Sequence, residues 1–275
     1  MSALATALYR GRQQVAALDA ADRGLAYGDG LFETLLVHEH RATWWPAHWA
    51  RLARGARALR IPVPNRHWLE AELGVLLPAA PPRAVLKIIL SRGVGGRGYV
   101  SDARAEPTLA LSVHEAPPPL PAAISVRWCQ TRMAIQPALA GLKHLNRLEQ
   151  VLARAEWRDS RIHEGLMLDT DGRVACATAA NVFALVRGRW LTPPVDRRGV
   201  AGVARAWVLA HEPRAVEAEL TPAQVESAEA VFLCNAVRGI LPVGSLGARR
   251  WPLHPALQDL QRRLGRSKPA FKPGS

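Results

Sequence analysis

The sequence predicts an α+β fold with two domains. Several strand-like apolar runs are joined by tight turns rather than by crossover helices, which argues against a doubly wound sheet. Four of the five residues from 117 to 121 are prolines, and such a run cannot continue a helix or a central strand. It divides the 275 residues into two parts of domain size. We therefore expect a smaller α/β domain over residues 1–116, a linker over 117–123 and a larger domain over 124–275.

In the first part, three strands and one helix can be placed in order. Residues 31–38, 84–90 and 108–113 are apolar runs typical of strands. Residues 46–59 have apolar side chains at helical spacing, with arginines between them. A second proline cluster, at 78–82, separates a helix from the strand that follows it.

The second part has a similar mixture of elements. Its pattern predicts strands at 124–128, 165–168, 182–186 and 230–234, and helices at 143–158 and 203–210. The sequence Asp-Thr-Asp-Gly at 169–172 is typical of a tight turn between two strands. Residues 249–272 are locally basic, and we interpret them as a solvated end of the chain.

Glycine-rich segments mark two candidate ligand contacts. Residues 93–98 match the pattern Gly-x-Gly-x-x-Gly, but no helix follows at once, so the context of a dinucleotide site is missing. We expect a hairpin loop that carries Arg97 and lets a ligand approach closely; a merely flexible hairpin tip is the alternative. Residues 199–205 lead into a helix whose first N–H groups could bind phosphate, although a simple entry turn has the same pattern. The Asn235-Ala236 pair, after a strand, offers a second amide-rich turn.

Composition narrows the function classes. The net charge is +13, but the basic residues are scattered and no nucleic-acid-binding motif is present, so we expect no nucleic-acid partner. No apolar run is long enough to span a membrane, and the N-terminus has no basic region before its apolar stretch. The three cysteines form no Cys-x-x-Cys pair, which predicts no disulfide framework, no structural zinc and a cytoplasmic location. The histidine spacing predicts no metal site.

Lys143 stands out because lysine is rare in this chain. Only four of the 36 basic residues are lysines, so arginine is the default cation. Arginine stays protonated and cannot form an imine, whereas a desolvated lysine can act as a base or attack a carbonyl group. Taken alone, Lys143 is more simply explained as a solvent-exposed lysine at the start of a helix. Its chemistry therefore has to be argued from its context.

That context resembles the class IV aminotransferase family of pyridoxal-phosphate enzymes, which has the fold type IV architecture. The most specific runs are Ser-Arg-Gly-Val-Gly-Gly-Arg-Gly-Tyr from Ser91 and Lys-His-Leu-Asn-Arg-Leu-Glu-Gln from Lys143. The resemblance covers residues 22 to 243, and its segments are 22–34, 47–52, 91–99, 142–150, 180–183, 199–205 and 234–236.

The resemblance implies the cofactor and the residues that hold it. Lys143 would bind pyridoxal phosphate covalently. Arg51 and the backbone amides of Val203 and Ala204 would hold the phosphate, in a larger C-terminal domain that carries the cofactor. The turn at Asn235 would contribute the amide of Ala236, and Ala180 would lie in the cofactor pocket.

The substrate side follows from the same resemblance. Arg97 is the candidate for binding a substrate carboxylate, with Phe32 and Tyr99 beside it. Within the family, the chain is most similar to the lyase branch, which converts 4-amino-4-deoxychorismate to 4-aminobenzoate and pyruvate for folate synthesis. The alternatives are an aminotransferase for D- or branched-chain amino acids, and a non-catalytic basic protein on the same scaffold. A homodimer acting on a small dicarboxylate is expected.

Cys176 departs from the family pattern. The family has a Glu at this position, five residues before Asn181, and that carboxylate keeps the pyridine nitrogen of the cofactor protonated. A thiol is a weak donor and supplies no negative charge. We expect the substitution to favour an aromatising elimination over transamination, or else to mark a protein that has lost its activity.

Overall fold

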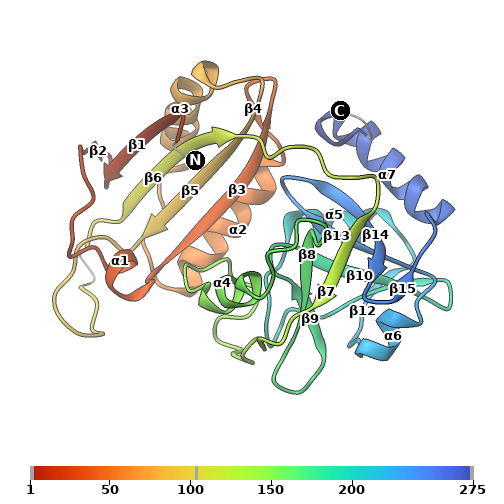
Figure 1. The fold of residues 1–275 in the computed structure, drawn as a ribbon. Helices are drawn as coiled ribbons and strands as arrows, with labels where there is room; N and C mark the ends of the chain where they lie inside the picture. The colour runs from red at the N-terminus through yellow and green to blue at the C-terminus, as the bar shows by residue number, and fades with distance from the viewer. Residues whose placement is uncertain (1–2, 103–104, 273–275) are drawn as a thin grey trace. The chain divides into compact units, whose positions relative to one another are not determined.

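The chain forms two compact units, which Figure 1 shows in a computed structural model that describes residues 3–102 and 105–272. Unit 1 comprises Met1–Pro117 and Leu142–Asn146, and unit 2 comprises Pro118–Gly141 and Arg147–Ser275. Residues 1–2 of the expected first domain and 273–275 of the second lie outside the described residues. A short stretch from the second half of the sequence thus belongs to the first unit.

Unit 1 is built on an antiparallel sheet of six strands in the order β2-β1-β6-β5-β3-β4. Its strands are β1 (Ala5–Arg10), β2 (Gln13–Gln14), β3 (Gly30–His38), β4 (Arg41–Ala42), β5 (Arg83–Ser91) and β6 (Thr108–Glu115). The three strands predicted in this part are confirmed as β3, β5 and β6. The antiparallel pairing of β5 with β6 also confirms that the glycine-rich loop connects a hairpin.

One face of this sheet is covered by helices. They are α2 (Trp45–Ala58) and α3 (Arg66–Leu76), followed by the short 3-10 helix η1 (Leu77–Ala79), whereas α1 (Arg23–Tyr27) contacts the end of β5. Leu52 and Ala56 of α2 and Leu69 of α3 are buried in one core with Leu35 and Leu86 of the sheet. The predicted helix at 46–59 is thereby confirmed as α2, with its apolar stripe facing the strands.

Unit 2 contains a mixed sheet of nine strands. Its order is β12-β11-β10-β13-β14-β7-β8-β9, and β15 pairs with β14. The strands are β7 (Ile124–Trp128), β8 (Glu164–Leu168), β9 (Val174–Ala177), β10 (Asn181–Val186), β11 (Arg189–Thr192), β12 (Ala215–Glu217), β13 (Ala230–Asn235), β14 (Gly239–Leu246) and β15 (Arg249–Arg250). The four strands predicted here are confirmed as β7, β8, β10 and β13.

The helices of unit 2 are α4 (Leu148–Ala155), α5 (Val203–His211), α6 (Pro222–Glu226) and α7 (Pro255–Ser267), with the 3-10 helix η2 (Pro269–Phe271). The helix predicted at 203–210 is confirmed as α5. The interpretation of residues 249–272 as a solvated end is wrong. Leu257, Leu260 and Leu264 are buried on one face of α7, because they recur at helical spacing between charged residues.

The helix predicted at 143–158 is also partly wrong, because it begins only at Leu148 and ends at Ala155. Residues 142–146 are extended and pair with the edge of β3 in unit 1. The cause is the open edge of β3, whose backbone groups at Gly30 and Phe32 need partners that only an extended segment supplies. Lys143 is therefore a residue of a strand-like segment and not of a helix.

Candidate active site

Lys143 is fixed to the edge of β3 by its backbone. The N–H of Phe32 donates to the carbonyl of Lys143 at 2.9 Å, and the N–H of Leu145 donates to the carbonyl of Gly30 at 3.0 Å. These two bonds flank the antiparallel bridge between Leu31 and His144. Because directly opposed residues of an antiparallel pair share a face, Lys143 and Phe32 project to the same side of the sheet.

The ring of Phe32 lies between two of the four lysines. The Lys143 Nζ is 4.1 Å from the ring centroid, and the Lys87 Nζ is 5.8 Å from it. Lys87 stands opposite Thr34 in the register of β5 with β3, so it shares the face of Phe32. The structure thus brings two sequence-predicted residues, Lys143 and Phe32, together on the sheet face opposite the core of unit 1.

The neighbouring residue, Glu33, points into the core and organises Arg51. Arg51 donates from Nε to Glu33 Oε1 at 2.9 Å and from Nη2 to Glu33 Oε2 at 2.5 Å. His48 approaches Oε2 through Nδ1 at 2.6 Å. All three side chains are buried. Sequence reasoning missed Glu33, although a glutamate at a core-facing position between Leu31 and Leu35 was a detectable signal.

The charges of this cluster follow from its surroundings. Burial alone would raise the pKa of Glu33, but the hydrogen bonds and charge of Arg51, assisted by His48, outweigh it and lower the pKa to about 2. Burial lowers the pKa of His48 in spite of Glu33, and the positive charges of Arg51 and Lys143 act in the same direction. Glu33 is therefore ionised and His48 neutral. Since a carboxylate only accepts, Nδ1 of His48 carries the proton.

Arg97 and Tyr99 lie on the exposed loop between β5 and β6. The Tyr99 side chain is 89% exposed and its ring lies 5.7 Å from the ring of Tyr27. The loop begins at Gly93, whose φ of +92° is a backbone conformation that favours glycine. A Cβ at this position would lie 1.9 Å from the carbonyl oxygen of Glu106. Glycine at 93 thus allows the two ends of the loop to approach each other closely.

In unit 2, the start of α5 has the properties of an anion site. Gly202 caps the helix without any side-chain hydrogen bond, and the first turn contains no acidic residue. The N–H groups of Val203 and Ala204 are among those that a helix leaves without an intrahelical partner. The helix dipole places partial positive charge at the same point. The predicted helix start is therefore able to receive a phosphate through backbone groups.

Asn181 supports this helix start from the sheet. Its Nδ2 donates to the carbonyl of Val200 at 3.0 Å, and its Oδ1 lies so close to Gly202 that a Cβ there would be 2.0 Å away. Asn181 is opposite Cys234 in the register of β10 with β13, so the turn at Asn235 lies at the same end of the sheet. In that turn, Asn235 Oδ1 accepts hydrogen bonds from the amides of Val237 and Arg238. The amide of Ala236 is not one of its donors. Sequence reasoning named these amides but missed the supporting role of Asn181.

Cys176 lies on β9 in an apolar cluster. It stands opposite Met167 in the register of β8 with β9, and the cluster also contains Cys129 and Trp157. Burial raises the pKa of the Cys176 thiol to about 12, so the group is an uncharged thiol at neutral pH. The turn after β9 closes with a hydrogen bond from the N–H of Ala177 to the carbonyl of Ala180, at 2.8 Å.

These groups fit the cofactor that the resemblance implies, in all but one respect. Taken separately, the amine of Lys143 in unit 1 suits an aldehyde carbon, and the backbone amides at 203, 204 and 236 in unit 2 suit a phosphate. The partner of the ring nitrogen is the exception, since position 176 carries no carboxylate.

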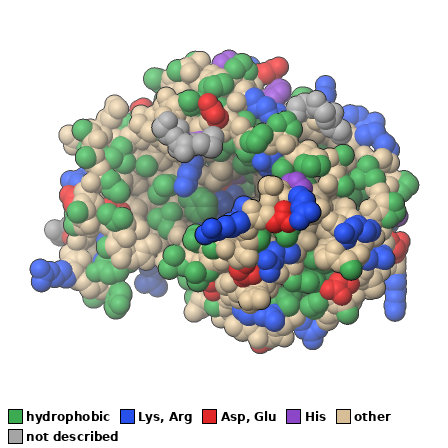
Figure 2. Space-filling view, in the orientation of Figure 1, with side chains coloured by type: hydrophobic (Ala, Val, Ile, Leu, Met, Phe, Trp, Pro, Cys, Tyr) green, Lys and Arg blue, Asp and Glu red, His purple; other side chains and the backbone are tan. Residues whose placement is uncertain are grey.

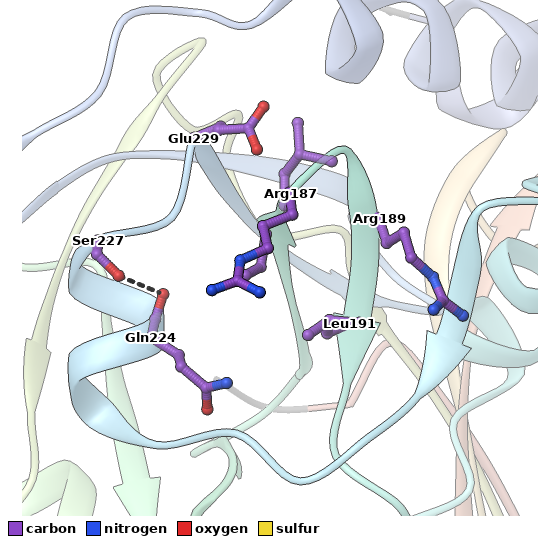
Figure 3. A pocket seen from close by; sticks show the side chains of 8 residues that line it. Arg187, Arg189, Leu191, Gln224, Ser227 and Glu229 are labelled. Carbon is purple, nitrogen blue, oxygen red and sulfur yellow. Dashed lines mark hydrogen bonds between the residues drawn. The ribbon is translucent and has the colours of Figure 1, made fainter.

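A separate cavity of about 610 Å³ lies in unit 2 between the β10–β11 hairpin and α6. Figure 3 shows Arg187 directed into it and a hydrogen bond between Ser227 and Gln224 at its rim. Its lining consists of Leu185, Val186, Arg187, Arg189, Leu191, Gln224, Ser227 and Glu229. None of the predicted site residues is among them, so this cavity is not the candidate active site.

Residues 3–102 and 105–272 contain neither a side-chain group suited to a metal ion nor a helix suited to crossing a membrane. No group of three or more His, Cys, Asp or Glu side chains in these ranges could hold a metal ion. Within the same ranges, every helix is too short or too polar to cross a membrane.

Comparison with known proteins gives a consistent result. The family profile of amino-transferase class IV matches residues 30–246. Aminodeoxychorismate lyase of Vibrio harveyi is 34% identical over 252 residues, which cover 88% of this chain and 92% of that protein. The crystal structure of 4-amino-4-deoxychorismate lyase from Pseudomonas aeruginosa has a TM-score of 0.87 at 40% identity, covering 95% of this chain and 99% of that one.

The fold extends to more distant proteins. Branched-chain amino acid aminotransferase from Escherichia coli superposes with a TM-score of 0.83 at 20% identity, over 95% of this chain and 93% of that one. This likeness concerns the fold alone. Together with the lyase structure, it confirms the predicted α+β fold of type IV.

Proposed function

The chain belongs to the class IV aminotransferase family, and on this premise we propose that it is a pyridoxal-phosphate-dependent aminodeoxychorismate lyase. It would convert 4-amino-4-deoxychorismate to 4-aminobenzoate and pyruvate. The similarity to two lyases of this name, at 34% and 40% identity, supports the choice of reaction. The observation that carries it is the placement of Lys143, a rare lysine whose amine is held beside Phe32 by backbone pairing.

We propose that Lys143 and the amides of Val203, Ala204 and Ala236 hold pyridoxal phosphate, with Arg51 as a further phosphate ligand. When bound, this cofactor supplies a carbonyl group for covalent attachment and a ring that takes up an electron pair. Glu33 serves the site indirectly, because it fixes the planar fork of Arg51 in one orientation.

Lys143 also moves the proton. With its amine free, Lys143 would act as a base and take the proton from the amine-bearing carbon of the substrate. Enolpyruvate would leave from the adjacent carbon with the electron pair of the broken C–O bond and take up a proton to become pyruvate, while the ring becomes aromatic. Arg97 binds a substrate carboxylate, and Phe32 and Tyr99 form apolar walls.

Cys176 favours the lyase over the aminotransferase alternative. An uncharged thiol leaves the ring nitrogen without an ionic partner, which makes the cofactor a weaker electron sink. Every proton-transfer step of transamination requires the cofactor to take up electrons. The lyase reaction requires this less, because formation of the aromatic ring makes the elimination favourable.

The proposal includes a cytoplasmic homodimer. Leu148, Val151 and Leu152 of α4 are each at least 60% exposed and share one helix face, which is suited to contact with a second copy. Cys129, Cys176 and Cys234 are all free thiols, in keeping with a reducing compartment.

The non-catalytic alternative, a basic protein that binds polyanions, has less support. On the face seen in Figure 2, lysine and arginine side chains are dispersed among other types and form no continuous stripe. A nucleic-acid surface normally gathers its positive charge on one face.

The test is the visible absorption spectrum of the purified protein with pyridoxal phosphate, before and after borohydride, alongside Lys143→Ala. We expect a visible band that borohydride traps covalently in the wild type and that is missing in the variant. The same preparations are then assayed for 4-aminobenzoate and for transamination. Absence of the band in excess cofactor would overturn the proposal, and transamination without 4-aminobenzoate release would favour the aminotransferase.

A further inference from the structure

The loop that carries Arg97 is hydrogen-bonded to one buried arginine. This residue, Arg23, is the first of α1 and is only 4% exposed, whereas Tyr99 and Val100 of the loop are 89% and 87% exposed. Its Nη1 donates to the carbonyl of Gly98 at 2.9 Å, and its Nη2 donates to the carbonyl of Tyr99 at 3.2 Å. Its Nε donates to Asp29 at 3.0 Å. The guanidinium thus connects a half-buried carboxylate to the carbonyls just after Arg97.

The other end of α1 contacts the same loop. The N–H of Gly98 donates to the Tyr27 hydroxyl at 3.1 Å, and the Tyr27 ring has the Arg23 guanidinium 4.8 Å from its centroid. The start of the loop is fixed by backbone bonds, since the N–H of Arg23 donates to Gly93 at 2.9 Å. Gly95 has to be glycine here, because a Cβ would lie 2.6 Å from the Arg23 side chain. The loop therefore contacts Arg23 on both sides, and the exposed Arg97 is the residue just before the carbonyls that Arg23 binds.

The same helix also contacts the segment of Lys143. Gly28, which caps α1 with a φ of +65°, accepts from Asn146 Nδ2 at 3.2 Å. A Cβ at Gly28 would lie 2.3 Å from Asn146 Oδ1. Asn146 is three residues after Lys143 in the segment that pairs with β3. Within unit 1, α1 is thus packed between the Arg97 loop and the lysine segment.

We propose that Arg23 is a positioning residue for Arg97, and that it sets the affinity for the substrate carboxylate by fixing the loop on α1. This inference rests on the proposed function, because it takes Arg97 as the group that binds that carboxylate. An arginine is required at 23, since one planar fork has to reach Asp29 and two successive carbonyls at once. The single nitrogen of a lysine cannot span these acceptors. A purely structural role would affect stability without a selective effect on substrate binding.

The test compares Arg23→Lys, Arg97→Ala and the double variant in steady-state lyase assays of the cofactor-loaded enzyme. We expect Arg97→Ala to raise KM about 10- to 100-fold, because a lost or misplaced carboxylate contact has effects of this order. Arg23→Lys should raise KM about tenfold and change kcat by less than about twofold. The double variant should be no worse than Arg97→Ala, because Arg23 acts through Arg97. Multiplicative effects, or a fall in kcat at unchanged KM, would overturn the proposal.

Arg92→Lys is the matched control. Arg92 is also buried and shares the carboxylate of Asp29, but its other donors reach the carbonyls of Leu59 and Arg60 and not the loop. We expect it to lower the free energy of unfolding and to leave KM within about twofold of the wild type, since it has no bond to the loop. An equal rise of KM in both variants would overturn the inference.

Hydrogen exchange separates this inference from the proposed function. In the absence of substrate, the amides of residues 98–100 should exchange faster in Arg23→Lys than in the wild type or in Arg92→Lys. Tyr27→Phe, which removes only the acceptor of the Gly98 N–H, should raise exchange at that amide in a milder way. Unchanged exchange in Arg23→Lys would overturn the inference even if the enzyme is a lyase. If Arg23→Lys exchanges faster than the wild type while the wild type has no lyase activity, the proposed function is overturned and the anchoring of the loop remains supported.

Discussion

The two units hold their candidate cofactor-binding groups in opposite ways. Unit 1 offers charged side chains, and each is held by a partner: Lys143 by backbone pairing with β3, and Arg51 by Glu33. Unit 2 offers backbone amides, and their arrangement requires that certain positions have no side chain. The clearest case is Gly202, where a Cβ would collide with Asn181. The first kind of site fails when a partner is removed, and the second fails when an atom is added. Substitutions of both kinds test this difference.

The largest effect is expected when the partner of Arg51 is removed. Glu33→Gln would leave a buried guanidinium without its counter-charge, which costs about 3–5 kcal/mol in the free energy of unfolding. Urea denaturation measures the loss, with Glu70→Gln as control, because Glu70 accepts from Arg66 and Trp45 near the surface. The control should be close to the wild type. Equal losses in the two variants would mean that the buried cluster is not special.

Acid should weaken the same cluster. The pKa of Glu33 falls from its ordinary 4.5 to about 2 on folding, and the pKa of His48 is also lowered from 6.5. Both groups therefore stabilise the fold above their unfolded pKa and lose that contribution as pH falls. The His48 part declines below pH 6.5, and the Glu33 part, up to about 3 kcal/mol, declines between about pH 4.5 and 2. Denaturation midpoints measured from pH 8 downward should fall less in Glu33→Gln than in the wild type; parallel curves would contradict the assignment.

A smaller effect is expected when one atom is added in unit 2. In Gly202→Ala the new Cβ displaces Asn181 Oδ1, which would be 2.0 Å away, and breaks the bond from Asn181 to Val200. We expect the Kd for pyridoxal phosphate to rise about 10- to 100-fold, the effect of one lost buried hydrogen bond and a shifted helix start.

Gly74→Ala is its control, because a Cβ there meets nothing within 4 Å. It should leave the cofactor Kd unchanged and stabilise α3 by about 0.5–1 kcal/mol. An unchanged Kd in both variants, measured by absorbance titration, would show that Gly202 does not shape a phosphate site.

The smallest effect concerns the ratio of two activities. Cys176→Glu would restore a carboxylate at a position on which the charges of Arg147 and Arg198 act. We expect transamination to rise about tenfold relative to 4-aminobenzoate formation, which corresponds to about 1.4 kcal/mol in barrier height. Initial rates of both reactions in the same preparation give the ratio. Equal changes in the two rates would remove the argument that Cys176 favours elimination.

The fold could be predicted where local pattern and tertiary environment agree. The apolar runs of β3, β5 and β13 and the helical stripe of α2 were visible in the sequence. Strand β14 was not, because Pro242 and Gly244 interrupt its pattern and its irregular register with β7 accommodates them. The apolar stripe of α7 is present in the sequence, but the many charged residues around it favour the interpretation as a solvated end. The extended form of residues 142–146 could not be predicted locally, since the edge of β3 imposes it.

The candidate site divides in a similar way. Lys143 and Arg97 could be named because a residue type or a motif marked them. Asn181 and Arg23 act through contacts with segments far away in the sequence, at Val200 and Gly98, so no local pattern identifies them. Glu33 lies between these cases, because a glutamate in the apolar phase of a strand is visible once the strand is recognised.

Residues 142–146 follow the proline linker in the sequence but belong to unit 1, so we expect the chain not to divide into two folding parts at that linker. A fragment ending at Pro117 would lack residues 142–146, and the carbonyl of Gly30 and the N–H of Phe32 would lose their partners. An uncovered strand edge of this kind recruits other chains. The N-terminal half should therefore aggregate when expressed alone and become soluble when a peptide spanning residues 142–146 is fused to it. If so, the proline linker marks a change in composition and not a boundary between independently folding parts.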